Sequence, residues 1–143
     1  MASSAPVEVG LVVCFGSVFV LLASLDLRAR TIPNAVVYPA LLCSWAWVDR
    51  GPISALVGGG GAFAVAVVFR TLSRGALGGG DVKMAALVGG VVGYPAVLIA
   101  GAVAAVGGGL TALLLLVTRR ATRTTALPYV PFLALGGIIA LLR

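Results

Sequence analysis

Five long runs without a charged residue make up most of this chain of 143 residues. A helix needs about 20 mostly apolar residues to cross the hydrocarbon core of a bilayer, and four of the runs suit one crossing each. With 61% hydrophobic and 10% charged residues, a soluble domain of this size could not bury its apolar surface. The pattern therefore excludes a soluble enzyme, a disordered tail and a nucleic-acid-binding domain, and predicts one membrane-embedded domain over residues 1–143. The runs are Val9–Leu25, Thr31–Val48, Gly51–Phe69, Met84–Thr118 and Thr124–Leu142.

The fourth run, Met84–Thr118, is too long for a single crossing. A continuous helix over it would extend about 52 Å, against a hydrocarbon core of about 30 Å. Gly89-Gly90 and Gly93-Tyr94-Pro95 supply turn-forming residues inside it. We therefore expect a short helix, a tight turn and a longer helix, which makes the predicted fold all-α, a polytopic membrane protein with six transmembrane helices.

The basic residues allow a test of this topology. With the N-terminus outside, six spans would place eight of the ten Lys and Arg residues on the cytoplasmic side, whereas five spans would place six there. The positive-inside rule favours six, and predicts a multi-pass protein of the inner (cytoplasmic) membrane. The cytoplasmic set would be Arg28, Arg30, Arg70, Arg74, Lys83, Arg119, Arg120 and Arg123, leaving Arg50 and Arg143 outside.

Residue types that are missing or isolated also limit the chemistry. The chain has no histidine, which removes Ser-His and Cys-His triads and nearly every zinc hydrolase geometry. Cys14 and Cys43 lie inside apolar runs, and we expect small core residues there, not a disulfide or a metal site. The first eight residues hold Glu8 and no Lys or Arg, so we expect the first run to be retained as a span and not cleaved as a signal peptide.

Glycine is concentrated at three places. Gly58–Gly61 and Gly107–Gly109 lie within predicted spans, where close helix packing is favoured over a substrate channel. The segment Arg70–Gly80 is the longest polar interruption and ends in three glycines. Because glycine absorbs large changes in φ and ψ, we expect a loop there that is poorly ordered or covers the neighbouring site, and that moves when a substrate binds.

Two of the four acidic residues occupy comparable places in the topology. Glu8 and Asp49 fit solvated interfacial positions, whereas Asp26 ends the first predicted span and Asp81 begins the fourth. Two crossings separate them, so both carboxylates are expected at the same membrane face. Carboxylates at membrane depth are costly and are candidates for function. A close pair of them can share one proton and act as an acid and a base.

Structural roles for these two aspartates remain open at this point. An aspartate after three glycines is a good helix N-cap, where the helix dipole favours an anion. Asp26 could equally form a salt bridge with Arg28 or Arg30.

Three motifs, in chain order, resemble those of one family. Gly78-Gly79-Gly80-Asp81-Val82-Lys83 resembles the GxGD-x-K signature of the type IV prepilin peptidases, which are aspartic membrane proteases. Asp26, followed by Arg-Thr-Ile-Pro-Asn at 30–34, resembles the family's first aspartate motif. Leu127–Pro131, preceding Gly136, resembles the stretch that enters the last helix. Presenilin-type proteases share the GxGD feature, but the Ile-Pro-Asn segment and the small size favour the prepilin branch.

The resemblance implies an aspartic endopeptidase with Asp26 and Asp81 as its catalytic dyad, and without a cofactor or a metal. It would remove the short basic leader of prepilins or pseudopilins at the cytoplasmic membrane face. The chain carries no CxxC pair and looks like the compact, peptidase-only type, so N-methylation is not expected. Its partners would be the substrate and a bilayer containing anionic lipids; the oligomeric state is open.

The other motif residues have supporting roles under this interpretation. Gly78, Gly79 and Gly80 would let an extended substrate backbone approach Asp81. Lys83 would lower the pKa of one aspartate or bind a lipid phosphate, with interfacial snorkelling as the alternative. Pro33 would begin the second span, and Asn34 would hydrogen-bond a nearby backbone group or carboxylate.

Two other functions are compatible with the sequence. A small transporter or proton-relay subunit would use the aspartates to carry protons, although such a relay would more naturally place an acid near the midplane of the membrane. A non-catalytic assembly subunit of a pilus or secretion machine would keep the fold without activity, but both aspartates are present at the motif positions.

Overall fold

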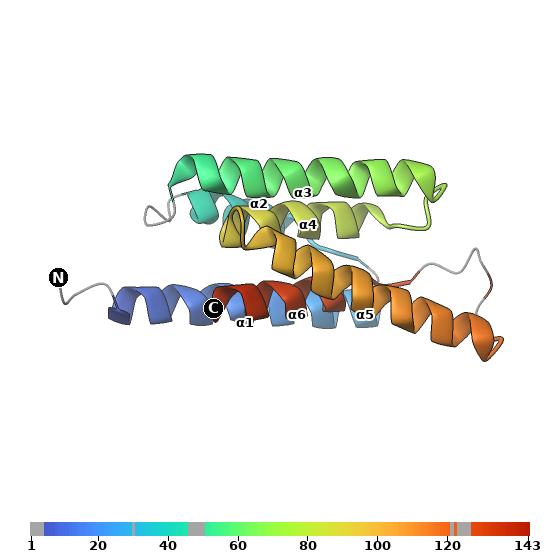
Figure 1. Ribbon diagram of the computed structural model, residues 1–143. Helices are drawn as coiled ribbons and strands as arrows, with labels where there is room; N and C mark the ends of the chain where they lie inside the picture. Colours follow the sequence, from blue (N-terminus) through green and yellow to red (C-terminus); the bar gives the residue numbers. More distant parts are fainter. Residues whose placement is uncertain (1–4, 30, 46–50, 121, 123–126) are drawn as a thin grey trace.

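The computed structural model describes residues 5–29, 31–45, 51–120, 122 and 127–143. Within these residues the protein is all-helical, with six helices and no strand (Figure 1). Successive helices run in alternating directions, so each end of the bundle collects helix termini. The helices are α1 (Ala5–Ala29), α2 (Asn34–Trp45), α3 (Pro52–Leu72), α4 (Gly79–Val92), α5 (Val97–Val117) and α6 (Val130–Leu141).

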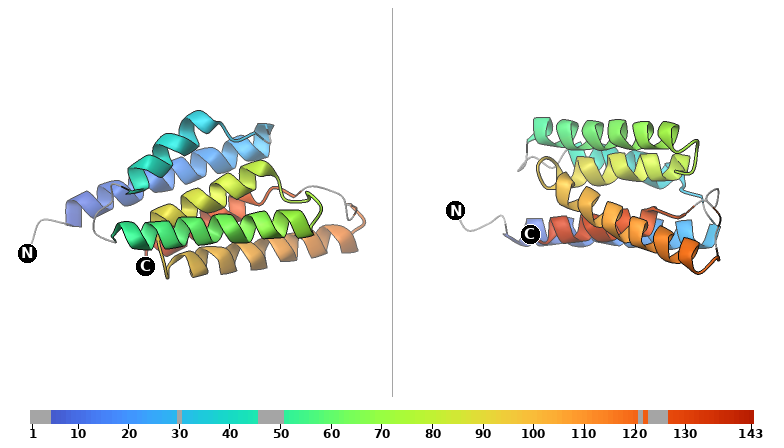
Figure 2. Two further views of the ribbon diagram at one scale, coloured as in Figure 1. Left: turned by 90° about the horizontal axis from the view of Figure 1, so that it is seen from above. Right: turned by 45° about the vertical axis from the view of Figure 1, so that its right-hand side comes forward.

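Helix α4 is the centre of the bundle. It contacts α2, α3, α5 and α6, while α1 packs mainly on α6. Figures 1 and 2 show α3 above α2 and α4, α1 and α6 together on the far side, and α5 running obliquely between these layers. Phe19, Leu22, Met84 and Leu87 have no exposed side-chain surface and form the middle of the main hydrophobic cluster. The core therefore lies between α4 and the α1–α6 pair.

The prediction of six transmembrane helices is correct in the number of helices and wrong in their lengths. Three segments are long and apolar enough to cross a membrane, namely Glu8–Ala29, Pro52–Leu72 and Val97–Val117. The helices α2 and α6 have 12 residues and α4 has 14, so each rises only about 18–21 Å. That is less than the hydrocarbon thickness of about 30 Å. Helix α4 is short because the turn after it divides the uncharged run Met84–Thr118. Helices α2 and α6 are short because they begin only after Pro33 and Pro128.

The predicted turn within the fourth run is confirmed, at one of the two proposed places. Helix α4 ends at Gly93, whose φ of 68° is a left-handed conformation that favours glycine, and the Tyr94–Pro95 peptide bond is cis. The Ser54 hydroxyl donates to the Tyr94 carbonyl over 2.9 Å and fastens this turn to the start of α3. Gly90, in contrast, lies inside α4 and forms no turn.

Glycines allow the main chains of α3 and α4 to touch. A Cβ at Gly58 would meet the carbonyl oxygen of Gly89, and one at Gly59 would lie 3.2 Å from the main chain of Gly90. Gly60 and Gly61 face open space. The expected close packing is thus confirmed for the first two glycines of that run, because only they face α4.

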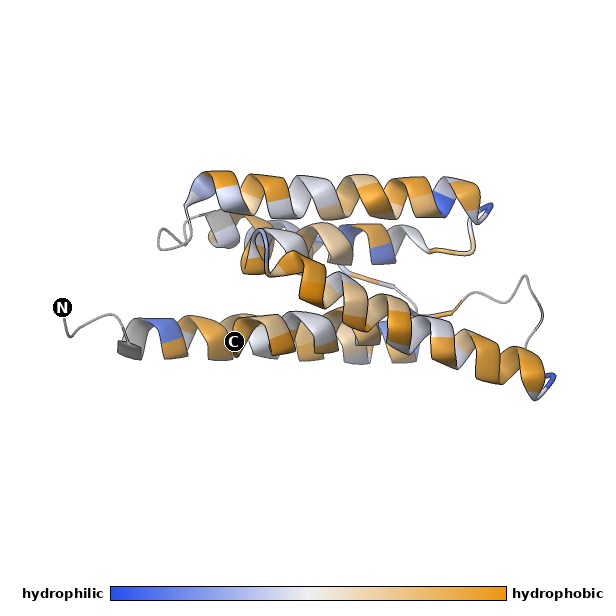
Figure 3. Cartoon of the chain, viewed as in Figure 1, coloured by the Kyte–Doolittle hydropathy of each residue, from blue (hydrophilic) through white to orange (hydrophobic). Residues whose placement is uncertain are grey.

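The outer surface of the bundle is strongly apolar, as expected for helices in contact with lipid. Large aliphatic side chains are exposed on the outer faces of the helices, and Figure 3 shows hydrophobic residues along them, with hydrophilic ones where α3 and α5 end. Cys14 and Cys43 are also exposed, on α1 and α2. The prediction that these cysteines lie in the core is therefore wrong, since an apolar run has outward-facing positions that no other helix covers. Asp49 lies outside the described residues.

Candidate active site

Asp81 is the third residue of α4, and its carboxylate folds back over the start of that helix. The main-chain N–H of Gly78, which precedes the helix, donates to Asp81 Oδ2 over 2.9 Å. This is the reach-back hydrogen bond of a capping box, and it satisfies an N–H group at the helix start. Asp81 therefore does stabilise the helix start, although from the third helical position and not from the N-cap. Only 6% of the residue is exposed.

Asp26 lies in the last turn of α1, three residues before that helix ends at Ala29, and is 8% exposed. The C-terminal end of α1 and the N-terminal end of α4 meet at the same end of the bundle (Figure 1). Asp26 is near enough for its negative charge to raise the pKa of Asp81. The structure thus brings together the two aspartates that the sequence singles out, at one end of the molecule.

The electrostatics of Asp81 reflect opposing influences. The residue stands outside the three long spanning helices, in the first turn of α4. Burial is the largest influence and, helped by the charge of Asp26, raises the pKa of Asp81 from 3.8 to about 6. The main-chain N–H of Gly78, which hydrogen-bonds the carboxylate, lowers the pKa, and the main-chain groups of Tyr129 and Val130 lower it further, so all three limit the rise. Near pH 6, Asp81 can therefore hold or release a proton.

Asn34 and Lys83 bond to each other. The ammonium group of Lys83 donates to Asn34 Oδ1 over 2.6 Å, which connects the first turns of α2 and α4. Lys83 is not among the groups that shift the pKa of Asp81. Pro33 precedes α2, and its carbonyl accepts the N–H groups of Val36 and Val37, which agrees with its predicted place at the start of this helix.

The three glycines before Asp81 have side chains close to them and no unusual dihedral angles. Gly78 has a φ of −67°, and Gly79 and Gly80 belong to the first turn of α4. A Cβ on Gly78 would lie 3.2 Å from Asp81 Oδ2, one on Gly79 2.8 Å from the guanidinium of Arg70, and one on Gly80 3.0 Å from the side chain of Ile32. Side chains therefore lie close to each of these glycines at the start of α4.

The polar segment before α4 is shorter than predicted. Helix α3 continues through Arg70 to Leu72, and α4 begins at Gly79, so the connection is only residues 73–78. Leu77 is buried and packs with Ala66, Val82 and Ala85. The prediction of a single loop over Arg70–Gly80 is therefore wrong, because α3 extends past the charge of Arg70 by more than half a turn and the glycines join α4.

Several groups around Asp81 were not predicted. The N–H groups of Tyr129 and Val130 belong to the main chain, and main-chain donors leave no residue-type pattern in a sequence. The motif Leu127–Pro131 marks the right segment but does not indicate its function. The contacts of Ile32 with Gly80 and of Arg70 with Gly79 also become visible only in the tertiary structure, where the segment before α2 and the end of α3 pack against α4.

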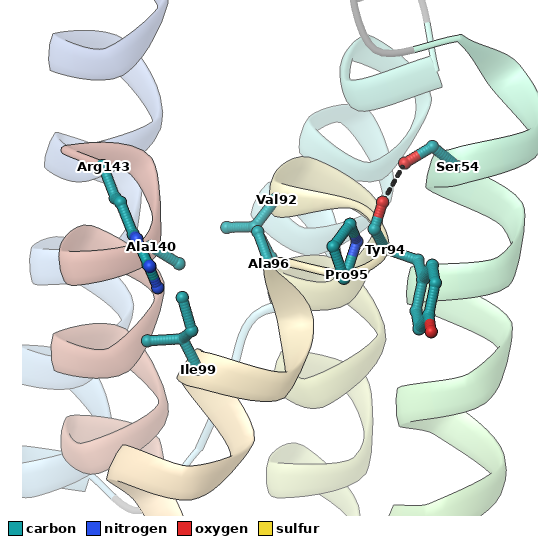
Figure 4. A pocket seen from close by; sticks show the side chains of 8 residues that line it. All are labelled: Ser54, Val92, Tyr94, Pro95, Ala96, Ile99, Ala140 and Arg143. Atoms are coloured by element: carbon teal, nitrogen blue, oxygen red, sulfur yellow. Dashed lines mark hydrogen bonds between the residues drawn. The ribbon is translucent and has the colours of Figure 1, made fainter.

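The described pockets lie away from the two carboxylates. One, of about 350 Å³, is at the opposite end of α4, between the Tyr94–Pro95 turn, Ile99 and Arg143 (Figure 4). Another follows the outer face of α1 from Val13 to Ser24. The aspartates themselves are buried, with 8% of Asp26 and 6% of Asp81 exposed. Within the described part of the chain, no group of three His, Cys, Asp or Glu side chains could hold a metal ion.

The fold and the site define an integral membrane protein of six helices with two buried aspartates at one end of the bundle. Residues 13–117 match the sequence profile of the type IV leader peptidase family, and the chain belongs to this family. It is similar to the prepilin leader peptidase/N-methyltransferase of Bacillus subtilis (strain 168), with 28% identity over 134 residues, 91% of the chain. The chain spans about half of that relative, 54%. No solved structure matches it.

Proposed function

We propose that this protein is an aspartic endopeptidase that removes the leader peptide of prepilins or pseudopilins, with Asp26 and Asp81 as its catalytic pair. The observation that carries the proposal is the approach of two buried carboxylates, from α1 and α4, that interact electrostatically. Membership of the type IV leader peptidase family supports the reaction class. The name of the Bacillus relative supports the substrate class.

The proposed chemistry requires one ionised and one protonated carboxyl group. The ionised aspartate takes a proton from water, whose oxygen attacks the carbonyl carbon of the scissile peptide bond. The protonated aspartate stabilises the developing oxyanion by donating its proton. When the tetrahedral intermediate collapses, the aspartate that took the proton from water gives it to the leaving nitrogen, the C–N bond breaks, and a hydroxyl of the intermediate returns a proton to the other aspartate. The products are a free leader carboxyl group and a new N-terminal amine. A pKa of about 6 for Asp81 supports a pair that holds one proton near pH 6.

Substrate access is proposed to require a local opening. Both aspartates are almost fully enclosed, so a peptide reaches them only when the elements around the start of α4 separate. The connection 73–78 and the exposed hydrogen bond between Lys83 and Asn34 are the weakest parts of that enclosure. Gly78, Gly79 and Gly80 then offer main chain without side chains beside Asp81.

The distribution of basic residues supports an active site at the cytoplasmic face of the inner membrane. Six described Arg and Lys residues lie at the end of the bundle that holds the aspartates, and Arg143 lies at the opposite end. By the positive-inside rule, the end with the aspartates faces the cytoplasm. Anionic headgroups there would attract both this basic surface and a basic leader. The six residues are Arg28, Arg70, Arg74, Lys83, Arg119 and Arg120.

Co-expression with a candidate prepilin tests the proposal, with leader removal detected as a mobility shift. We expect Asp26→Asn and Asp81→Asn each to abolish cleavage while the protein still accumulates in the membrane. Glu8→Gln is the matched control, because Glu8 is an exposed carboxylate near the other end of α1. Cleavage at the parent rate by either aspartate variant would exclude the two-carboxylate mechanism, and a proton-relay role would then be tested by transport assays.

A further inference from the structure

Tyr129 forms an aromatic contact that joins α3 to the start of α6, at the same end of the bundle as Asp81. It is the N-cap residue of α6, and its ring meets Phe69 of α3 edge-on, with ring centroids 6.5 Å apart. Phe132, one turn further along α6, makes a second edge-on contact at 6.5 Å. The ring also packs on the buried cluster that contains Leu77 and Val82. The ring therefore packs the start of α6 against α3.

The ring of Tyr129 rests on α5 at a glycine. A Cβ added to Gly108 would lie 2.5 Å from ring atom Cε1 and 2.8 Å from Cζ, distances that real Cβ atoms do not show. The next residue, Gly109, has nothing within 4 Å of an added Cβ. Only the first of these adjacent glycines is thus needed for the aromatic ring to reach its place. Edge-on aromatic packing and this close contact together restrict the ring to one position.

The main chain of the same residue faces the carboxylate. The main-chain groups of Tyr129 and Val130 lower the pKa of Asp81, the Tyr129 ring packs on the cluster that contains Val82, the residue after Asp81, and Val130 has no exposed surface. The free N–H groups at a helix start favour an anion. The charged groups on the elements packed around Asp81 are Asp26 on α1, Arg70 beside Gly79, and Lys83, which bonds Asn34.

We infer that Tyr129 is a positioning residue: its ring, seated on Gly108 and against Phe69, holds the first turn of α6 so that two main-chain N–H groups bind the Asp81 carboxylate. The inference rests on the proposed function for its catalytic meaning. The Asp81 carboxylate is then oriented by three parts of the chain: α4 itself, Gly78 immediately before α4, and the start of α6. Since the side chain of Tyr129 does not itself bond the carboxylate, it acts through the main chain.

The first test compares Gly108→Ala with Gly109→Ala. The methyl group at 108 displaces the ring and with it the N–H donors, so we expect prepilin cleavage to fall about 10- to 100-fold, as for a displaced catalytic group. The inflection of the pH–rate profile near pH 6 should move to higher pH, because groups that lower the pKa of Asp81 are lost. Gly109→Ala should keep both the rate and the inflection. An unmoved inflection in Gly108→Ala would overturn the inference, even if the protein were less stable.

The second test removes the ring itself. Tyr129→Phe keeps the ring and should retain the parent inflection, whereas Tyr129→Ala should slow cleavage. In the double variant, Gly108→Ala should have no additional effect, since the ring that it displaces is gone. Additive effects of the two substitutions would show that they act independently, and would contradict the inference.

A measurement that does not depend on cleavage separates this inference from the proposed function. The pH dependence of unfolding reports the pKa of Asp81 directly, once the profile of Asp81→Asn is subtracted. We expect the inflection in this difference to lie at higher pH in Gly108→Ala than in the parent. If Asp81→Asn cleaves prepilin normally, the proposed function fails, while the unfolding profiles still decide whether Tyr129 positions Asp81. Coincident profiles would overturn the positioning role alone.

Discussion

Replacing Asp81 by asparagine should stabilise the folded protein above about pH 6, although it abolishes the proposed activity. In the parent, burial raises the pKa of Asp81 from 3.8 to about 6. A shift of about two units corresponds to about 3 kcal/mol between the protonated and ionised forms in the folded state. An asparagine carries no charge and keeps an oxygen that can accept the Gly78 N–H. The substitution therefore removes the cost of the buried ionised group.

The direction of the pH dependence follows from which state holds the proton more tightly. The folded-state pKa of Asp81 lies above the unfolded value, so protonation stabilises the fold. The contribution of Asp81 to the free energy of unfolding is fully present below about pH 4 and is lost as the pH rises through about 6. We thus expect the stability of Asp81→Asn, relative to the parent, to increase by about 3 kcal/mol between about pH 4 and about pH 8.

The assay is reversible unfolding in detergent micelles, followed by circular dichroism, at a series of pH values. Glu8→Gln is the control, because Glu8 is exposed in the first turn of α1, and its profile should run parallel to that of the parent. A difference between Asp81→Asn and the parent that stayed constant with pH would refute the reasoning. It would mean that water reaches Asp81 and that its carboxyl group is not desolvated.

Three further predictions concern the packing and the chemistry of the site. Gly89→Ala should lower the free energy of unfolding by about 1–3 kcal/mol, since the added Cβ would meet the Gly58 carbonyl. Gly60 faces open space, so Gly60→Ala should raise the free energy of unfolding by up to about 1 kcal/mol. Equal unfolding midpoints of the two variants would contradict this prediction. Lys83→Met and Asn34→Ala should each cost about 1 kcal/mol and show coupling in a double-mutant cycle, which additive effects would disprove. Prepilin cleavage should persist in EDTA; inhibition that zinc reverses would overturn the two-carboxylate mechanism.

The sequence was sufficient for the general character of the protein. The uncharged runs predict an all-helical membrane protein, and turn-forming residues at Gly93–Pro95 predict the division between α4 and α5. The count of crossings between Asp26 and Asp81 predicts that both lie at one end. These inferences succeed because they depend on hydrophobicity along the chain and on local backbone preference. The lengths of α2, α4 and α6 were less predictable, since charges bound a hydrophobic run without determining where its helix starts.

The sequence by itself determined the membrane environment, the six helices and the two acidic residues of the candidate site. Only the tertiary structure decided what surrounds Asp81: the main-chain donors of Tyr129 and Val130, some 50 residues away, and the Lys83–Asn34 pair. The tertiary structure also decided which glycines allow close packing, since the Tyr129 ring lies against Gly108, whereas the adjacent Gly109 faces open space. The physical reason is that every residue except proline has a main-chain N–H, so the use of that group depends on where packing places it and hardly on the residue type.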